Sequence, residues 1–366
     1  MSDAIITALG AVTSVGFDAV TACASIRAGL SRPDSIAEFE VLDREDQAPI
    51  GVTGHPVPLL TRGFSGVGRW LQMAAVAIED LCSSGKLPGA DDTAFWSSTF
   101  GYVVVPVIDA QRFVATEACQ SDQAIEASFL HPLRRRVSSL FAPSKTVLLT
   151  RGRGGVLEAM ALAQEHFRQH RFERVVVLAV DSLTDPPGLN WLSEMGRLKE
   201  DENPVGLVPG EAAVAFMLEM PRVAQTRGAQ PLGRLASVAV GREPHSRWRG
   251  ERSQGVQLAS VVKRALTEAR CPLPYTAETS TDLNGEAWRS EEYGHAQVRV
   301  SQARWSSDSA GLPAACVGDL GTAMSAMQVV MACRAHIRGY AQADPILFTS
   351  SDVYGNVGAA MIGKAS

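Results

Sequence analysis

The sequence predicts an α/β protein in which helices and two sheets alternate in five layers, αβαβα. Strand-like and helix-like segments alternate along the whole chain. Both halves end in the same series of helix, strand, polar loop and strand, which indicates an internal duplication. Residues 320–333 have helical character and carry no charge, although 20% of the chain is charged, so this helix is expected to be buried between two sheets.

The first half, residues 1–225, begins with a buried strand and a turn that leads into a helix. Residues 33–62 contain several prolines and are expected to form an irregular excursion or cap. Residues 100–140 are poorly periodic and are interpreted as a lid or a subunit contact. The elements predicted for this half are strands at 4–9, 146–150, 175–180 and 211–218, and helices at about 17–28, 66–82 and 154–170.

The second half, residues 226–366, repeats this plan in a shorter form. The elements predicted for it are strands at 233–240, 346–349 and 357–362, and helices at about 256–269 and 319–337. The uncharged helix and its counterpart at 154–163 would be the two central helices. Outer helices would then cover the sheets on both sides.

Composition excludes several classes of protein. The chain has 366 residues, 46% of them hydrophobic, and a net charge of −5, which is typical of a globular protein with a large core. The chain lacks a concentrated basic face, so we expect no nucleic-acid and no membrane partner. The acidic start lacks the pattern of a signal peptide, and no apolar run approaches the ~20 residues of a membrane span. We therefore expect a cytoplasmic protein.

The cysteines and histidines show no spacing that is typical of metal sites or of disulfide-bonded proteins. The six cysteines lie at wide, irregular spacings, without a C-x-x-C pair. His166 and His170 are four residues apart on a predicted helix, but no third ligand is evident, and we interpret them as exposed. The sequence therefore predicts no metal and no cofactor.

Several motifs, spread in order along the chain, resemble those of β-ketoacyl synthases in the thiolase superfamily. Residues 4–16, AIITALGAVTSVG, resemble the family's opening VVITGLGAVTPLG, and residues 150–156, TRGRGGV, lie where the family has TACxSGV. Further matching segments are VDS at 180–182, GEAAVA at 210–215, TSTDLN at 279–284, GDL at 318–320 and YGNVG at 354–358. The resemblance implies the thiolase-like five-layer sandwich of two duplicated halves.

The resemblance also implies where catalytic residues would lie, and none of them is present. Family members use a cysteine nucleophile and two histidines. These positions fall on Gly152, Ala277 and Asp319. The family's lysine falls on Ala314 and its gating phenylalanine on Asn356. Glycine accepts no acyl group and an ionised aspartate repels an enolate, so we expect a pseudoenzyme without condensing activity.

The replaced site has its own charged residues. Arg151 and Arg153 flank Gly152 at a helix start, and Asp319 should approach from the opposite half. One interpretation is an internal Arg–Asp ion pair that plugs the former site, since an unpaired buried charge is costly. The alternative is that both arginines and the helix start bind an anion such as phosphate or carboxylate.

Two cysteines deserve comparison with the missing nucleophile. Cys82 lies in LCSSG, which looks like the family's ACSSG, but at the C-terminal end of a helix, where the dipole disfavours a thiolate. Cys316 is near Asp319, but its small apolar neighbours favour a buried, unreactive thiol. Another acyl-transfer activity remains an alternative for which the sequence offers no nucleophile.

Two functions are compatible with these features. The first is a scaffold or adaptor that acts through dimerisation, since GRLK at 196–199 and NPVGLVPGE at 203–211 resemble degenerate thiolase-like proteins associated with type VI secretion effector loading. The second is a chain-length-factor-like partner of an active synthase in fatty acid, polyene or polyketide synthesis. The expected partners are a second copy or another thiolase-like protein, and a secreted effector or an acyl carrier protein.

Overall fold

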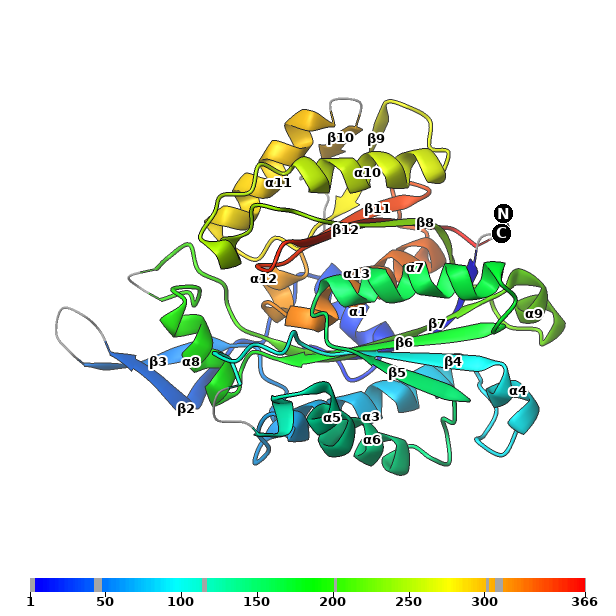
Figure 1. The fold of residues 1–366 in the computed structure, drawn as a ribbon, viewed down its shortest axis with the longest axis horizontal. Coiled ribbons are helices and arrows are strands. Elements are labelled where there is room, and N and C mark those ends of the chain that lie inside the picture. The colour runs from blue at the N-terminus through cyan, green and yellow to red at the C-terminus, as the bar shows by residue number, and fades with distance from the viewer. Residues whose placement is uncertain are drawn as a thin grey trace.

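The computed structural model describes residues 4–42, 48–113, 117–200, 203–300, 303–306 and 312–365. The predicted five layers are present (Figure 1). Helices α10 and α11 cover one end of the stack, α3, α5 and α6 cover the other, and α7, α13 and α1 lie in the middle. Their bounds are Ala19–Arg27 for α1, Val67–Ser84 for α3, Asp122–Ile125 for α5, His131–Arg136 for α6, Gly154–Arg168 for α7, Val256–Glu268 for α10, Ala287–Arg299 for α11 and Met324–Arg338 for α13.

The two sheet layers are hydrogen-bonded into one sheet of ten strands, in the order β10-β9-β11-β12-β8-β1-β7-β6-β4-β5. Among the described strands, the layers are joined by a short pairing of β1 with β8 alone. The bounds are Ala4–Val12 for β1, Thr99–Val104 for β4, Lys145–Leu149 for β5, Arg174–Ser182 for β6, Glu211–Glu219 for β7, Gly233–Arg242 for β8, Tyr275–Ser280 for β9, Ala303–Ser306 for β10, Ile346–Ser351 for β11 and Asn356–Gly363 for β12.

The two halves have the same strand order and the same strand directions. In the first half β1, β7 and β6 pair antiparallel, and β4 and β5 continue the sheet in parallel with β6. In the second half β8, β12 and β11 pair antiparallel, and β9 and β10 continue in parallel with β11. The last strand of the first half in chain order is β7 and the first of the second half is β8, with helix α9, Pro221–Thr226, between them.

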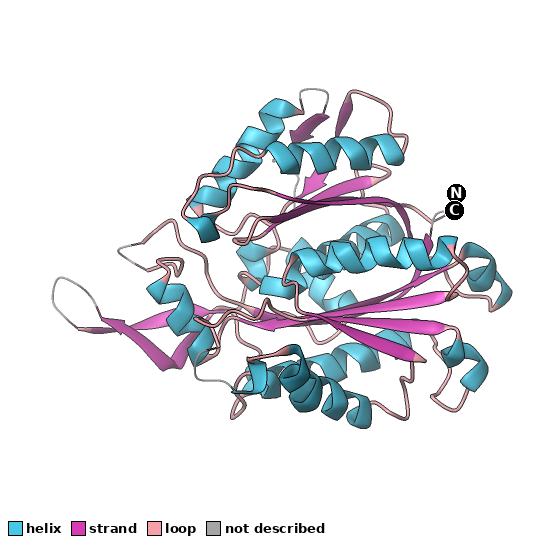
Figure 2. Cartoon of the chain, viewed as in Figure 1, coloured by secondary structure: helices cyan, strands magenta, loops and turns pink. Residues whose placement is uncertain are grey.

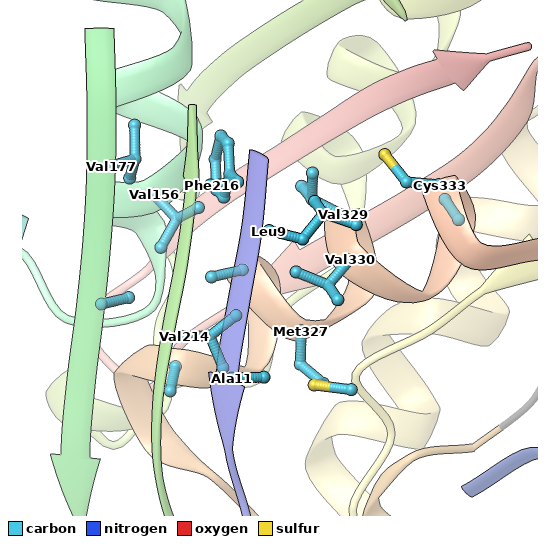
Figure 3. Packing of buried hydrophobic residues seen from close by; sticks show 14 of the residues in the cluster. Leu9, Ala11, Val156, Val177, Val214, Phe216, Met327, Val329, Val330 and Cys333 are labelled. Atoms are coloured by element: carbon cyan, nitrogen blue, oxygen red, sulfur yellow. The ribbon is translucent and has the colours of Figure 1, made fainter. Parts of the chain in front are cut away.

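Buried apolar side chains hold the middle layer in place. Helices α7 and α13 contact strands of both sheet layers. Figure 3 shows Val156 of α7 between Val177 of β6 and Phe216 of β7, and Val329 and Val330 of α13 near β1. All five of these side chains are fully buried. The uncharged helix is therefore buried between the two sheet layers, as its sequence predicts, and packs mainly against apolar side chains.

Strand β1 lies against helix α3 at a distance that only glycine permits. A Cβ atom on Gly10 would lie 2.1 Å from the carbonyl oxygen of Ala77 and 2.7 Å from the amide nitrogen of Leu81. The side chain of Asp80 on α3 accepts hydrogen bonds from the amides of Ala11 and Ala19, which ties α3 to β1 and to the start of α1. Glycine in the opening motif thus has a packing function.

Some predictions about the elements are wrong. The excursion predicted at residues 33–62 is present but is not irregular: its described residues include a hairpin of β2, Asp34–Leu42, and β3, Pro49–Gly54, that projects from the body, followed by helix α2, Pro58–Thr61 (Figures 1 and 2). The interpretation of residues 100–140 as a lid or subunit contact fails for their first residues, which belong to β4, a strand within the sheet, and stays a prediction for the rest. The central helix α13 begins at Met324 and not at Asp319, because a short 3-10 turn at Gly321–Ala323 precedes it.

Of the helices in the described part of the chain, none combines the length and apolar character required to cross a membrane. The remaining helices are short: α4, Thr93–Ser97, α8, Pro186–Glu194, and α12, Ala314–Val317. Helix α8 packs against the projecting hairpin through β2.

Candidate functional site

The candidate site lies where loops from both halves meet in the middle of the molecule. The loop between β5 and α7 brings Gly152 and Arg153, and the segment before α13 brings Asp319. The loop after β9 brings Asp282 and the loop after β11 brings Asp352. These loops follow parallel strands of the two halves, and the carboxyl ends of such strands are where α/β proteins place their sites.

Gly152 makes the turn into helix α7 in a conformation that favours glycine. Its φ is +58°, and its amide donates a hydrogen bond to the carbonyl of Val105 at 3.0 Å. A Cβ atom there would lie 3.2 Å from a methyl carbon of Val107. The position expected to carry a nucleophile therefore holds only backbone, on a turn that a larger side chain would strain.

Arg153 begins helix α7 and directs its buried side chain into the site. It forms an ion pair with Asp319, and its other terminal nitrogen lies 3.2 Å from Asp282. Asp282 also pairs with Arg289 of α11 at 2.9 Å. All four side chains are at least nine-tenths buried. Arg153 of the first half thus pairs directly with Asp319 and Asp282 of the second half. Through Asp282 it is also connected to Arg289.

A second buried ion pair extends this network. Arg197, from the loop after α8, donates two hydrogen bonds to Glu286, at 2.8 and 3.0 Å. Asn284 connects the two pairs, because its side-chain amide donates to both Asp319 and Glu286. We call this set the ion-pair network; its charged members are Arg153, Arg197, Arg289, Asp282, Glu286 and Asp319. Its positive and negative charges balance.

The electrostatics keep Asp319 and Glu286 ionised. Burial alone would raise the pKa of Asp319, but Arg153, Arg289 and the Asn284 amide outweigh it and hold the pKa below its ordinary value. Burial would likewise raise the pKa of Glu286, but the paired Arg197 lowers it below its ordinary value. Asp319 is thus a carboxylate at neutral pH, so it accepts hydrogen bonds and donates none.

A further ion pair lies beside the network. Arg112 donates to Asp181 at 2.6 Å, and Asp181 also accepts from the amide and hydroxyl of Thr322 at the start of the α13 segment, at 2.9 Å. Tyr354 donates its hydroxyl proton to Asp109 at 2.6 Å. Between these groups and the ion-pair network, a cavity of about 60 Å³ remains. Small-molecule sites commonly measure ~300–1,000 Å³, so this space admits a few waters.

The structure brings together only two of the three charged residues singled out in the sequence. Arg153 and Asp319 meet in the network, whereas Arg151 is exposed and lies 3.7 Å from Glu158 on the surface of α7. Ala277 lies on β9, and its side chain falls outside the described residues. Ala314 is half-buried in α12, and Asn356 donates its side-chain amide to Asp352 at 2.8 Å.

The cysteines are free thiols, and the two considered as nucleophiles are buried. Burial and the Glu79 carboxylate raise the pKa of Cys82 to about 12. Burial also raises the pKa of Cys316, whose Sγ lies 3.7 Å from the carbonyl oxygen of Ile26. Neither sulfur belongs to the site. The prediction of an exposed His166 is wrong: this half-buried ring is hydrogen-bonded to the Tyr102 hydroxyl at 2.8 Å.

Several members of the ion-pair network, and Arg112 beside it, were not predicted from the sequence. Asp282, Glu286 and Arg289 are spaced four and three residues apart, a spacing that matches charges on one side of a helical turn. Asp282 lies inside TSTDLN at 279–284, one of the segments that resemble the family, which was a signal available in the sequence. Arg197 and Arg112 lie in loops, where periodicity carries no information about burial.

Comparison with protein-family models and with curated proteins finds no match. Solved structures, in contrast, match over the whole chain. They include the ishigamide ketosynthase/chain length factor, with TM-score 0.74, 17% identity and full coverage of both chains. A type II polyketide synthase ketosynthase in complex with its acyl carrier protein has TM-score 0.75, 18% identity and full coverage of both chains.

A β-ketoacyl synthase from Burkholderia phymatum STM815 matches at TM-score 0.75 and 14% identity, again over all of both chains. The likeness extends across both halves and is a likeness of fold. The chain therefore has the five-layer, thiolase-like fold of β-ketoacyl synthases and chain length factors.

Proposed function

We propose that this chain is a non-condensing protein of the β-ketoacyl synthase fold that acts as a scaffold or adaptor by associating with other proteins. The observation that carries the proposal is the buried ion pair between Arg153 and Asp319. It occupies the place where the resemblance puts the nucleophile's helix start and the second histidine. An acyl group would have to displace paired, buried charges, which is costly.

The chemistry of the individual residues supports the same proposal. Gly152 has no side chain to carry an acyl thioester, so the covalent route is lost. Asp319 is held in its ionised form and would repel the negative charge that develops when a malonyl group is decarboxylated. Loss of a single oxyanion donor costs ~100- to 1,000-fold in rate, and here the nucleophile is absent as well.

Association is the function that the remaining fold can perform. We infer that the partner is a second copy or another thiolase-like protein. Strand β5 ends the sheet, so one of its edges has no neighbouring strand among the described strands. Backbone groups on such an edge are available to pair with another chain. This supports an interface at β5, in line with a role that depends on binding.

Two settings for this role lead to different partners. In the first, the protein helps to load a type VI secretion effector, which the segments at 196–199 and 203–211 support. In the second, it is the non-catalytic partner of an active ketosynthase in fatty acid, polyene or polyketide synthesis. The similarity to a ketosynthase/chain length factor structure favours the second setting, with an acyl carrier protein as a further partner.

Co-purification from the native host tests the proposal and separates the two settings. We expect a tagged full-length chain to retain a second thiolase-like chain in near-equal amount. An effector beside a second degenerate chain supports the adaptor, and an intact ketosynthase with an acyl carrier protein supports the partner subunit. A chain that purifies as a monomer at physiological concentration, with neither kind of protein bound, contradicts the proposal.

A further inference from the structure

A second cavity, of about 250 Å³, lies on the other side of the first-half sheet from helix α7. It lies between β4, β5 and β6 on one side and α3 and α6 on the other, and it is open to solvent. Its walls include Ile78 of α3, Leu133 of α6 and Val176 of β6, which are buried. It has no lining residue in common with the cavity beside Gly152, so it is a separate site.

The cavity is a cleft that opens to solvent on one side, where Arg134 and Ser138 are exposed. Its walls are mainly apolar and offer a water molecule few of the hydrogen-bond partners it needs. An apolar group that enters the cleft removes its own surface and that of the walls from water, which is favourable. The cleft therefore favours an apolar ligand.

A positively charged side chain, that of Arg134, lies at the edge of this cavity. Arg134 of α6 is exposed and donates a hydrogen bond to the carbonyl oxygen of Thr146 on β5, at 3.2 Å, so its side chain reaches from the helix to the end of the sheet. Within the described part of the chain, no acidic side chain forms an ion pair with Arg134. A guanidinium has further N–H groups, which match the geometry of a carboxylate.

We propose that this cavity binds a small monocarboxylate, with its apolar body among Ile78, Leu133 and Val176 and its carboxylate on Arg134. Apolar burial would supply the main attraction, and the arginine would fix the orientation. The site is independent of the ion-pair network and goes beyond the proposed scaffold function.

Isothermal titration of the purified full-length chain with octanoate and with neutral 1-octanol tests this site. We expect saturable binding of one octanoate per chain. Arg134→Gln should weaken octanoate binding by about five-fold, the value of an exposed ion pair, and leave 1-octanol binding unchanged. Arg135→Gln is the matched control, because Arg135 is exposed on the same helix and does not line the cavity.

A second variant tests the apolar part. Ala142 is half-buried in the loop before β5 and lines the cavity, so Ala142→Phe should fill the space and abolish binding of both ligands. If this variant does not fold, the Arg134→Gln and Arg135→Gln pair still decides the question. No saturable binding of octanoate by the wild type at millimolar concentration would overturn the proposal, as would binding that neither Arg134→Gln nor Ala142→Phe alters.

Discussion

At the scale of single residues, Arg153 has the largest effect on the character of the site. It is buried, and it faces two carboxylates from the opposite half, Asp319 and Asp282. Breaking a buried ion pair by removing one partner costs about 3–5 kcal/mol, because the other charge stays buried without compensation. Replacing both partners by apolar residues of similar size costs far less.

This asymmetry gives a first prediction. Asp319→Leu should lower the free energy of unfolding by about 3–5 kcal/mol, because Arg153 then loses its main partner. The double variant Arg153→Met with Asp319→Leu should recover much of that loss, because Asp282 keeps its pair with Arg289. Urea unfolding of the wild type, both single variants and the double variant measures the coupling. Strictly additive losses would show that the pair contributes nothing as a pair.

A second prediction concerns Gly152. Its positive φ makes any Cβ unfavourable, so Gly152→Ala should lower the free energy of unfolding by about 1–3 kcal/mol. Gly294→Ala is the control: it lies inside helix α11 with nothing within 4 Å of an added Cβ, so it should stabilise by up to about 1 kcal/mol. Chemical denaturation compares them. Equal effects of the two substitutions would contradict the role of the turn.

The residues that the sequence could place at the site were those at the start of a recognisable helix, Arg153 and Asp319. Arg153 was predicted to meet Asp319, and it does. Arg151 was grouped with it, but Gly152 lies between the two arginines in a left-handed conformation, and Arg151 is exposed toward Glu158. Spacing along the chain does not determine on which side of such a turn a side chain lies.

At the scale of elements, helix α13 has the strongest requirement for burial. Val330 is fully buried in the middle layer, whereas Ile337, near the end of the same helix, is 37% exposed. An aspartate at the first position would have to leave water without a partner, and at the second it would remain solvated.

Val330→Asp should therefore prevent stable folding or lower the melting temperature by many degrees. Ile337→Asp, with the same chemical change on the same helix, should alter the free energy of unfolding by about 1 kcal/mol or less. Circular dichroism melting of the two variants against the wild type measures this difference. Similar melting temperatures for the two variants would mean that α13 is not enclosed as described.

The elements that the sequence revealed were those with a strong pattern, such as α3, α7 and α13. Strand β4 was missed because all of its residues are buried, so it lacks the alternation of polar and apolar residues that marks a half-buried strand. Strand β9, with the residues YTAETS, was missed because it is polar in sequence. Its place in the sheet comes from pairing with β10 and β11, which a single sequence does not display.

At the scale of the whole molecule, the duplication explains why a charged network can be buried at all. The loops of both halves end at the same place, and each half supplies charges that the other neutralises: Arg153 and Arg197 meet Asp319, Asp282 and Glu286. The sequence predicted the five layers and the two halves, because buried helices and a repeated order of elements are visible in it. The pairing of β1 with β8, which connects the layers, depends on three-dimensional contacts.

The central claim is that this chain, although it has the fold of β-ketoacyl synthases, does not catalyse the condensation of acyl groups. It is tested most directly by intact-mass spectrometry of the purified chain after incubation with acetyl-CoA and hexanoyl-CoA, with an active β-ketoacyl synthase as positive control. We predict an unchanged mass for this chain, because Gly152 lies where the resemblance puts the nucleophile and both Cys82 and Cys316 have raised pKa values. An acyl adduct on any of the six cysteines, at a yield like that of the control, would contradict the account.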